Sequence, residues 1–339
     1  MFMETRPNSG ARAGRRVARA GAALAFLFFL GTFVRPSATP EPQRSAAARL
    51  TVETVALDPS DPARTRIGSL TFIRGYRLSS SDPRFGGISA MHVEGGEVLA
   101  VSDAGSAIRF PLPTGAGALP LRIEALRQVP GPAGLKSDRD SESMAVHGRQ
   151  AWVAVENRNT IWRYRLPGLD FEAGAAPPAM RQWPSNAGAE AILRLRDGRF
   201  LVFAEGPVGE DGTSPALLFD GDPARASSGA AALRYRPPGG YRITDAALLP
   251  NGRMLFLNRR FTLLEGWSAI LTVGERGALE AGAMLEGREL AALGAPLGVD
   301  NMEALSVTSE GGRTMLWIAS DDNFTPMLQR SLLLGFALD

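Results

Sequence analysis

The chain has 339 residues, 45% of them apolar, which is enough for a sizeable core in one or two domains. It contains no cysteine, which excludes a disulfide framework and a thiolate metal site. Eight arginines and two glutamates lie in residues 1–49, so the remainder carries 29 of the 37 basic and 33 of the 35 acidic residues, a net charge of −4. Without a basic excess or a basic–aromatic run, this remainder is not expected to bind nucleic acid.

Residues 1–36 have the layout of a bacterial export signal, in which an arginine-rich region precedes an apolar stretch at residues 20–34. That stretch is shorter than the about 20 apolar residues of a spanning helix. Because no clean cleavage site follows it, a retained membrane anchor through residues 20–34 is the alternative. We therefore expect a periplasmic or secreted protein, either free or tethered to the inner membrane, with residues 37–49 as a linker.

From residue 50 onward, short β-branched stretches alternate apolar and polar residues, a pattern typical of strands. Residues 50–57 (LTVETVAL) and 331–338 (SLLLGFAL) are examples, and turns such as residues 250–253 (PNGR) separate such stretches. Residues 286–293 are the one stretch with a helical pattern. We expect residues 50–339 to form a single all-β domain.

A repeated unit runs through this domain. Each copy has a polar head residue before a short apolar run, then a turn, then a strand that ends in a second polar residue. The heads are spaced 53, 48, 55 and 58 residues apart: Ser89, Glu142, Glu190, Asp245 and Glu303. A period near 50 with several strands per unit is typical of propeller blades. Five copies and the strands of residues 50–84 predict a β-propeller of six antiparallel blades, closed by pairing of the N- and C-terminal strands.

The innermost strand of each blade lines the central channel, so the head residues are expected to converge there. Four carboxylates at one mouth repel each other unless a cation lies among them. Many oxygen ligands, no cysteine and two histidines favour Ca²⁺ over zinc or copper. A second acidic set, at the ends of the adjacent strands, is expected near the same face. The candidate metal ligands are Glu142, Glu190, Asp245, Glu303, Asp103, Glu156, Glu205 and Asp321. For each acid alone, a hydrogen bond that closes a turn is the alternative.

Other candidate constellations are weaker. His92 and His147 occupy equivalent repeat positions, and we expect them in turns or at the surface. The sequence contains no G-x-S-x-G nucleophile elbow, P-loop or dinucleotide fingerprint. Arginine binds phosphate or carboxylate in bidentate fashion, and Arg84 and Arg330 are the strongest candidates because both flank motif-like stretches. The five tryptophans are expected in the core between blades.

Four stretches resemble the phytase-like family, described as having the esterase-like activity of phytase. They are residues 84–90 (RFGGISA), 101–105 (VSDAG), 300–304 (DNMEA) and 320–326 (SDDNFTP), the last followed by Gln329 and Arg330. The resemblance covers about residues 66–339 and implies an exported β-propeller with phosphoesterase activity. It also implies similarity to calcium-dependent β-propeller phytases, in which calcium ions at the channel mouth bind phosphate and activate water. Those phytases use lysines as well as arginines around phosphate. Lys136 is the one lysine of this chain, which argues against phytate as its substrate.

Two functions follow. The first is a Ca²⁺-dependent hydrolase of a phosphoester or another ester, with Glu142, Glu303, Arg84 and Arg330 as catalytic residues. The second is a non-catalytic propeller that binds a ligand or protein in the cell envelope. In either case we expect a monomer, and for the hydrolase a small-molecule ester. Convergence of the acids in one place with an arginine beside them favours the hydrolase.

Overall fold

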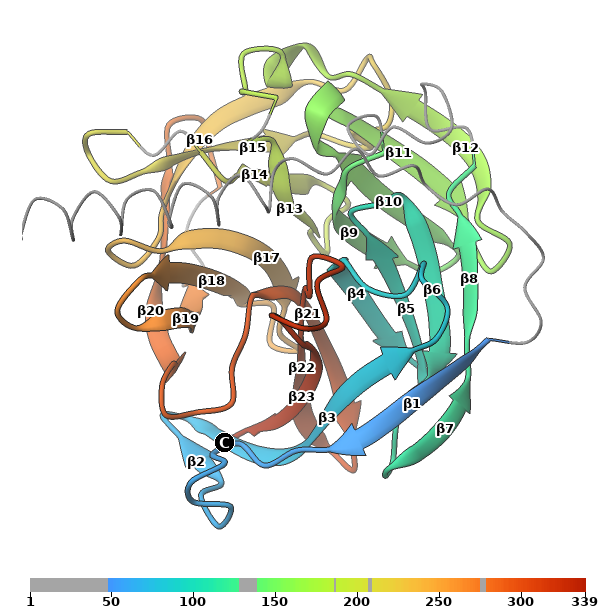
Figure 1. Cartoon of the computed structure of the whole chain (residues 1–339). Helices are drawn as coiled ribbons and strands as arrows, with labels where there is room; N and C mark the ends of the chain where they lie inside the picture. The colour runs from blue at the N-terminus through green and yellow to red at the C-terminus, as the bar shows by residue number, and fades with distance from the viewer. Residues whose placement is uncertain (1–47, 128–138, 186, 207–208, 275–278) are drawn as a thin grey trace, which may run out of the picture. The chain divides into compact units, whose positions relative to one another are not determined.

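Strands make up nearly all the regular structure of the protein in a computed structural model (Figure 1). The structure describes residues 48–127, 139–185, 187–206, 209–274 and 279–339. The predicted export segment and almost all of the predicted linker lie outside these residues. Helical structure in the described parts is limited to two 3-10 turns, Glu156–Arg158 and Pro178–Met180. No helix in these parts is long and apolar enough to cross a membrane.

Each copy of the sequence repeat begins a blade of four neighbouring antiparallel strands. From the innermost strand outward, the first two blades are β4 (Ile88–Glu94), β5 (Glu97–Ser102), β6 (Ser106–Pro111) and β8 (Arg122–Ala125), then β9 (Ser141–His147), β10 (Gln150–Val155), β11 (Thr160–Arg165) and β12 (Asp170–Ala175). The next two are β13 (Ala189–Arg194), β14 (Phe200–Ala204), β15 (Ser214–Phe219) and β16 (Ala230–Arg236), then β17 (Arg242–Leu248), β18 (Met254–Thr262), β19 (Gly266–Gly274) and β20 (Met284–Leu293). The last is β21 (Met302–Glu310), β22 (Arg313–Ser320), β23 (Ser331–Leu338) and β3 (Leu70–Ser80).

The innermost strands β4, β9, β13, β17 and β21 pack against one another in a closed ring, with the remaining strands outside it (Figure 1). This is a β-propeller, as the repeat predicted. Residues 286–293, which have a helical pattern, lie instead in β20, where Arg236 of β16 pairs in parallel with Glu286. This extra pairing joins the third and fourth blades at their outer edges.

The N- and C-terminal parts of the chain close the ring. β23 pairs with β3 from Ser331 opposite Leu78 to Leu338 opposite Leu70, so an early strand completes the last blade. The six predicted blades are not confirmed, because the described strands form five. Residues 50–84 contribute β3 to the last blade and place β1 (Arg49–Thr54) beyond it, rather than forming a blade of their own. β2 (Arg66–Ile67) and β7 (Gly117–Pro120) extend the same sheet.

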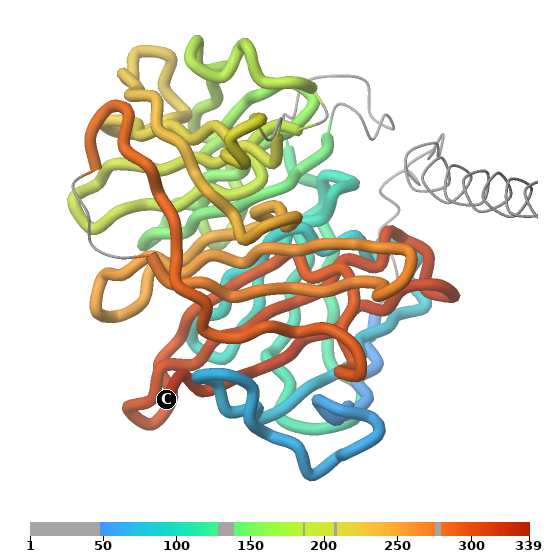
Figure 2. Tube along the Cα trace, turned by 90° about the vertical axis from the view of Figure 1, so that its left-hand side faces the viewer, coloured from blue at the N-terminus to red at the C-terminus, as the bar shows by residue number. Residues whose placement is uncertain are grey.

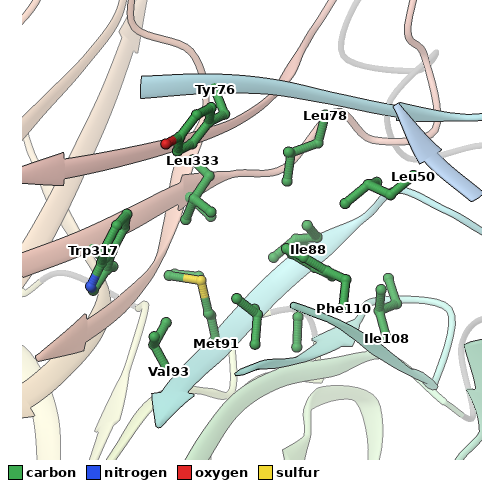
Figure 3. Close-up of a cluster of buried hydrophobic side chains, with 14 of the residues drawn as sticks. Leu50, Tyr76, Leu78, Ile88, Met91, Val93, Ile108, Phe110, Trp317 and Leu333 are labelled. Carbon is green, nitrogen blue, oxygen red and sulfur yellow. The ribbon is translucent and has the colours of Figure 1, made fainter. Parts of the chain in front are cut away.

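The core lies between the faces of neighbouring blades. Between the last and first blades, Tyr76, Ile88, Phe110 and Trp317 belong to one buried apolar cluster (Figure 3). Tryptophans are buried at positions 152, 162, 183 and 317, as predicted for the core between blades. Trp267 differs, because it lies half-buried on the hairpin between β18 and β19. Packing of these faces sets the arrangement of the blades in the ring, and this arrangement sets the positions of the head residues.

Candidate functional site

Every innermost strand carries a β-bulge near its first residue. The register skips one residue at the same point of each strand: Ser89, Glu142, Glu190, Thr244 and Glu303. A bulge inserts one unpaired residue and changes the direction in which its side chain points relative to the alternating side chains of the strand. The ring therefore presents five equivalent positions at one end, which we call the bulge end. Three of the five positions hold glutamate.

Acids of neighbouring blades lie close together at the bulge end. Burial raises the pKa of Glu142 well above its usual value, and repulsion from Asp140 and Glu190 raises it further. Burial likewise raises the pKa of Glu190, with additional repulsion from Glu205 and Glu156. These mutual effects need short separations, so the acids form one group. We call Asp140, Glu142, Glu156, Glu190, Glu205 and Glu303 the central acidic cluster.

Three members of the cluster have the geometry of a cation site. One carboxylate oxygen from each of Asp140, Glu142 and Glu156 lies within 4.8 Å of the others. The backbone holds two of them together, because the Glu156 amide donates to the Asp140 carbonyl at 2.8 Å. Asp140 Oδ2 accepts from Asn157 Nδ2 at 3.0 Å. Asp140 Oδ1, however, is buried and accepts from no amide, hydroxyl or guanidinium donor, and a hydrogen bond with the Asp140 carboxyl contributes to the raised pKa of Glu142. An orphaned carboxylate oxygen beside two further acids is a fitting ligand for a cation.

Arg259 supplies positive charge to the other side of the cluster. Its guanidinium contacts Glu303 Oε1 at 2.6 Å and Glu205 Oε1 at 3.4 Å, and also donates to Asn301. Burial lowers the pKa of Arg259, but attraction from Glu303 and Glu205 outweighs that effect, so the pKa is raised. Arg259 is therefore a permanent cation. It gives Glu303 an ion-pair partner, while burial raises the pKa values of Glu142 and Glu190.

Arg259 occupies a repeat position that is acidic in the other four blades. In those blades, the residue just before the bulge pairs with a residue of the next strand, and the residue after that partner is an acid: Asp103, Glu156, Glu205 and Asp321. In the fourth blade Asn258 pairs with Ile243, and Arg259 follows it. Arg259 was not singled out from the sequence, although its place in the repeat, where the other four blades have an acid, could have identified it. Asp140 was also missed, although it lies two residues before Glu142.

The predicted ligands Asp103 and Asp321 lie between the first and last blades. Burial raises the pKa of Asp321, and repulsion from Glu303 and Asp103 adds to the effect. Beside them, Asp322 Oδ1 accepts from the Gly87 amide at 3.0 Å. Gly87 has a φ of +62°, and a Cβ there would lie 2.3 Å from Asp103 Oδ1. The family-like stretches thus interlock across the seam that closes the ring.

Asp245 does not lie with the other predicted ligands. Its carboxylate accepts from the Ala246 amide and from the Leu305 amide of the neighbouring strand β21, each at 2.7 Å. Burial raises the pKa of Asp245 well above its usual value, and these two hydrogen bonds only partly offset that effect. Thr244 takes the bulge position instead and donates to the Met302 carbonyl at 3.2 Å. The head of the fourth repeat is therefore displaced by one residue.

We expect Asp245→Asn to destabilise the protein by about 1–3 kcal/mol, because an amide replaces one of two buried carboxylate acceptors. The loss should be the same in Ca²⁺ and in EGTA. Thermal unfolding in both solutions measures it. A loss seen only in Ca²⁺ would instead make Asp245 a metal ligand.

The remaining predicted residues are engaged outside the cluster. Arg84 pairs with Asp82, at 2.6 Å between Nη2 and Oδ2, and Arg330 pairs with Asp300 at 3.2 Å. His92 and His147 lie toward the other end of β4 and β9, away from the bulges. The site therefore combines carboxylates with Arg259, and the two histidines do not contribute to it.

Residues 83–324 match the family described as "Phytase-like: Esterase-like activity of phytase". The chain belongs to this family. None of the curated proteins matches this phytase-like protein in sequence. Among solved structures, it is similar to the glutaminyl cyclase of Myxococcus xanthus, with 11% identity over 80% of this chain and 97% of that one, at a TM-score of 0.43. The major allergen Mala s 1 of Malassezia sympodialis is similar at 13% identity, over 81% and 91% of the two chains, also at a TM-score of 0.43.

Proposed function

We propose that this phytase-like protein is an exported, Ca²⁺-dependent hydrolase of phosphoesters or other esters. The observation that carries the proposal is the meeting of Asp140, Glu142 and Glu156 in one cluster that Arg259 also contacts. Ca²⁺ binds oxygens at about 2.3–2.6 Å, so two ligands on opposite sides of one ion lie about 5 Å apart. The 4.8 Å limit among the three carboxylates fits that spacing. Hard oxygen donors without sulfur also match this ion.

The residues divide into roles that ester hydrolysis needs. A bound Ca²⁺ would supply Lewis acidity and lower the pKa of water. Glu303, paired with Arg259 at 2.6 Å, is the general base in this proposal. Burial and neighbouring acids raise the pKa of Glu190, which suits a proton donor. Arg259, rather than Arg84 or Arg330, is the arginine placed to bind an anionic oxygen of the substrate.

The test measures release of p-nitrophenol from p-nitrophenyl phosphate and from p-nitrophenyl butyrate, in Ca²⁺ and in EGTA. We expect hydrolysis of at least one ester that requires Ca²⁺, and a loss of about 100-fold or more in Glu142→Gln. Asp197→Asn is the matched control, because this carboxylate lies in an exposed turn and accepts from the Arg199 amide. It should retain full activity.

A non-catalytic propeller that binds an envelope ligand is the second candidate, and the same cluster supports it. Calcium binding without hydrolysis of either ester would favour this candidate. Absence of both calcium binding and hydrolysis would overturn the proposed metal site itself.

A further inference from the structure

Exposed apolar side chains gather on two loops of the propeller. Among the described residues, six large apolar side chains are exposed, and Ile73 is the one that lies elsewhere. Leu263 and Leu264, 69% and 99% exposed, form the tip of the hairpin between β18 and β19. Met327 and Leu328, 97% and 72% exposed, lie in the loop between β22 and β23. Folding leaves these side chains in water, which is unfavourable unless a partner covers them.

Both loops project from the bulge end of the ring. β17 begins there and β18 returns to it, so the hairpin after β18 lies at that end. The same geometry places the loop after β22 there, because β22 is antiparallel to β21. The two loops belong to neighbouring blades, and both lie at the right-hand end of the body in Figure 2. Four exposed apolar tips therefore surround part of the end that carries the central acidic cluster.

An aromatic pair joins the first tip to the cluster. Phe261 and Trp267 face each other across the hairpin with ring centroids 4.8 Å apart. Arg259, which contacts Glu303, lies over the Trp267 ring at 5.7 Å. At a membrane surface, apolar side chains enter the lipid chains, and tryptophan and arginine lie at the boundary with water. The hairpin has this arrangement, with an apolar tip followed by Trp267 and Arg259.

The start of the described body lies at the same end. β3 ends there, since its Leu78 pairs with Ser331 at the beginning of β23. β1 begins opposite this end of β3, with Leu50 paired to Ser80. The chain that precedes β1 contains the apolar residues 20–34, about 15 positions before the body begins. A membrane interaction of that segment would hold the bulge end near the lipid surface.

We propose that the bulge end docks on a lipid membrane by inserting the tips Leu263–Leu264 and Met327–Leu328. The side chains stand on two separate protruding loops rather than on one flat face, which suits insertion into a fluid surface better than a rigid protein contact. Nearby charges are paired, Arg260 with Glu265 at 2.6 Å and Arg330 with Asp300. Apolar insertion, rather than attraction to anionic lipid, thus drives the binding. This docking does not depend on catalysis or on bound Ca²⁺.

The chain has no cysteine, so a single introduced cysteine can carry an environment-sensitive NBD fluorophore. The test labels Leu264→Cys in the full chain and, as a control, Ser309→Cys, an exposed position toward the other end of β21. Phosphatidylcholine vesicles are added in EGTA. We expect a blue shift at position 264 that nitroxide-labelled acyl chains quench, and no change at position 309. Because the label reports local lipid contact, attachment through residues 20–34 alone leaves it in water.

The second arm replaces the other tip. Met327→Ser with Leu328→Ser, introduced into the labelled Leu264→Cys chain, should raise the lipid concentration needed for the vesicle-induced shift about 100-fold, since each of the two inserted side chains contributes roughly a factor of ten. A label at position 264 that stays aqueous overturns the proposal. So does an equal response at position 309, or a shift that appears on raising the protein concentration without vesicles, which would indicate pairing of two copies.

Discussion

In EGTA, the melting temperature of this phytase-like protein is expected to fall as the pH rises above about 5, and saturating Ca²⁺ is expected to reduce that fall. The cause lies in buried carboxyl groups with raised pKa values, among them Glu142, Glu190 and Asp321 near the proposed metal site and Asp245 away from it. In the folded state they keep protons that the unfolded chain releases at lower pH. Stability is therefore greatest at low pH and is lost as the pH rises from the unfolded pKa through the folded pKa.

Bound Ca²⁺ changes how protonation of the ligands affects stability. The ion binds ionised carboxylates, so the metal-bound protein no longer gains stability from protonation of its ligands. At a Ca²⁺ concentration about 100 times Kd, binding adds about 2.7 kcal/mol, which corresponds to roughly 4–5 °C in melting temperature for a body of this size. Carboxyl groups with lowered pKa, such as that of Asp197, act below about pH 4 and leave this window unaffected. Melting curves at several pH values, in EGTA and in Ca²⁺, measure both effects.

Glu142→Gln removes one proposed ligand while keeping the shape of the side chain. It should abolish most of the calcium-induced rise and flatten the pH dependence in EGTA, because one buried acid is gone. Asp197→Asn makes the same chemical change in an exposed turn and should leave both unchanged. Glu303→Gln should also reduce the calcium response. Equal calcium responses in all three variants would contradict a shared metal site.

The sequence predicted the ring of acids because the repeat places one polar residue at the same phase of each innermost strand. Glu142, Glu190 and Glu303 occupy the bulges, as that phase required. Asp245 was assigned to the same position, but the bulge falls on Thr244. A bulge shifts the register by one residue, and a repeat period that varies from 48 to 58 residues does not resolve such a shift.

The sequence repeat could not predict which side chains pair with one another in the folded protein. Arg84 and Arg330 flank the stretches that resemble the family, yet their guanidinium groups pair with Asp82 and Asp300 near them in the structure. Arg259 was passed over because the other blades have acids at its position. The blade count failed for a similar reason: residues 50–84 alternate like strands, but only pairing partners decide whether strands form a new sheet or extend an existing one.

Arg259→Met is expected to lower stability by about 3–5 kcal/mol at pH 8, because buried Glu303 loses the cation that contacts it at 2.6 Å, whereas Glu205 keeps Arg242 at 3.3 Å. Arg234→Met is the matched control. Arg234 pairs with Asp211 at 3.1 Å, but both side chains are about half exposed, so the loss should stay below about 1 kcal/mol. Chemical denaturation at fixed pH measures the difference between the two variants.

The pH dependence of that loss identifies its origin. Without Arg259, the raised pKa of Glu190 should rise further, since an attractive positive charge is gone, and the carboxyl groups of the central acidic cluster should take up protons more readily. Their protonation near pH 5 then relieves the repulsion, so the deficit of Arg259→Met should shrink as the pH falls, whereas that of Arg234→Met should stay small throughout. A deficit independent of pH would mean that Arg259 acts through packing on Trp267. A deficit that shrinks at low pH would show that the cluster needs a cation at neutral pH, which is the condition that a bound Ca²⁺ would also meet.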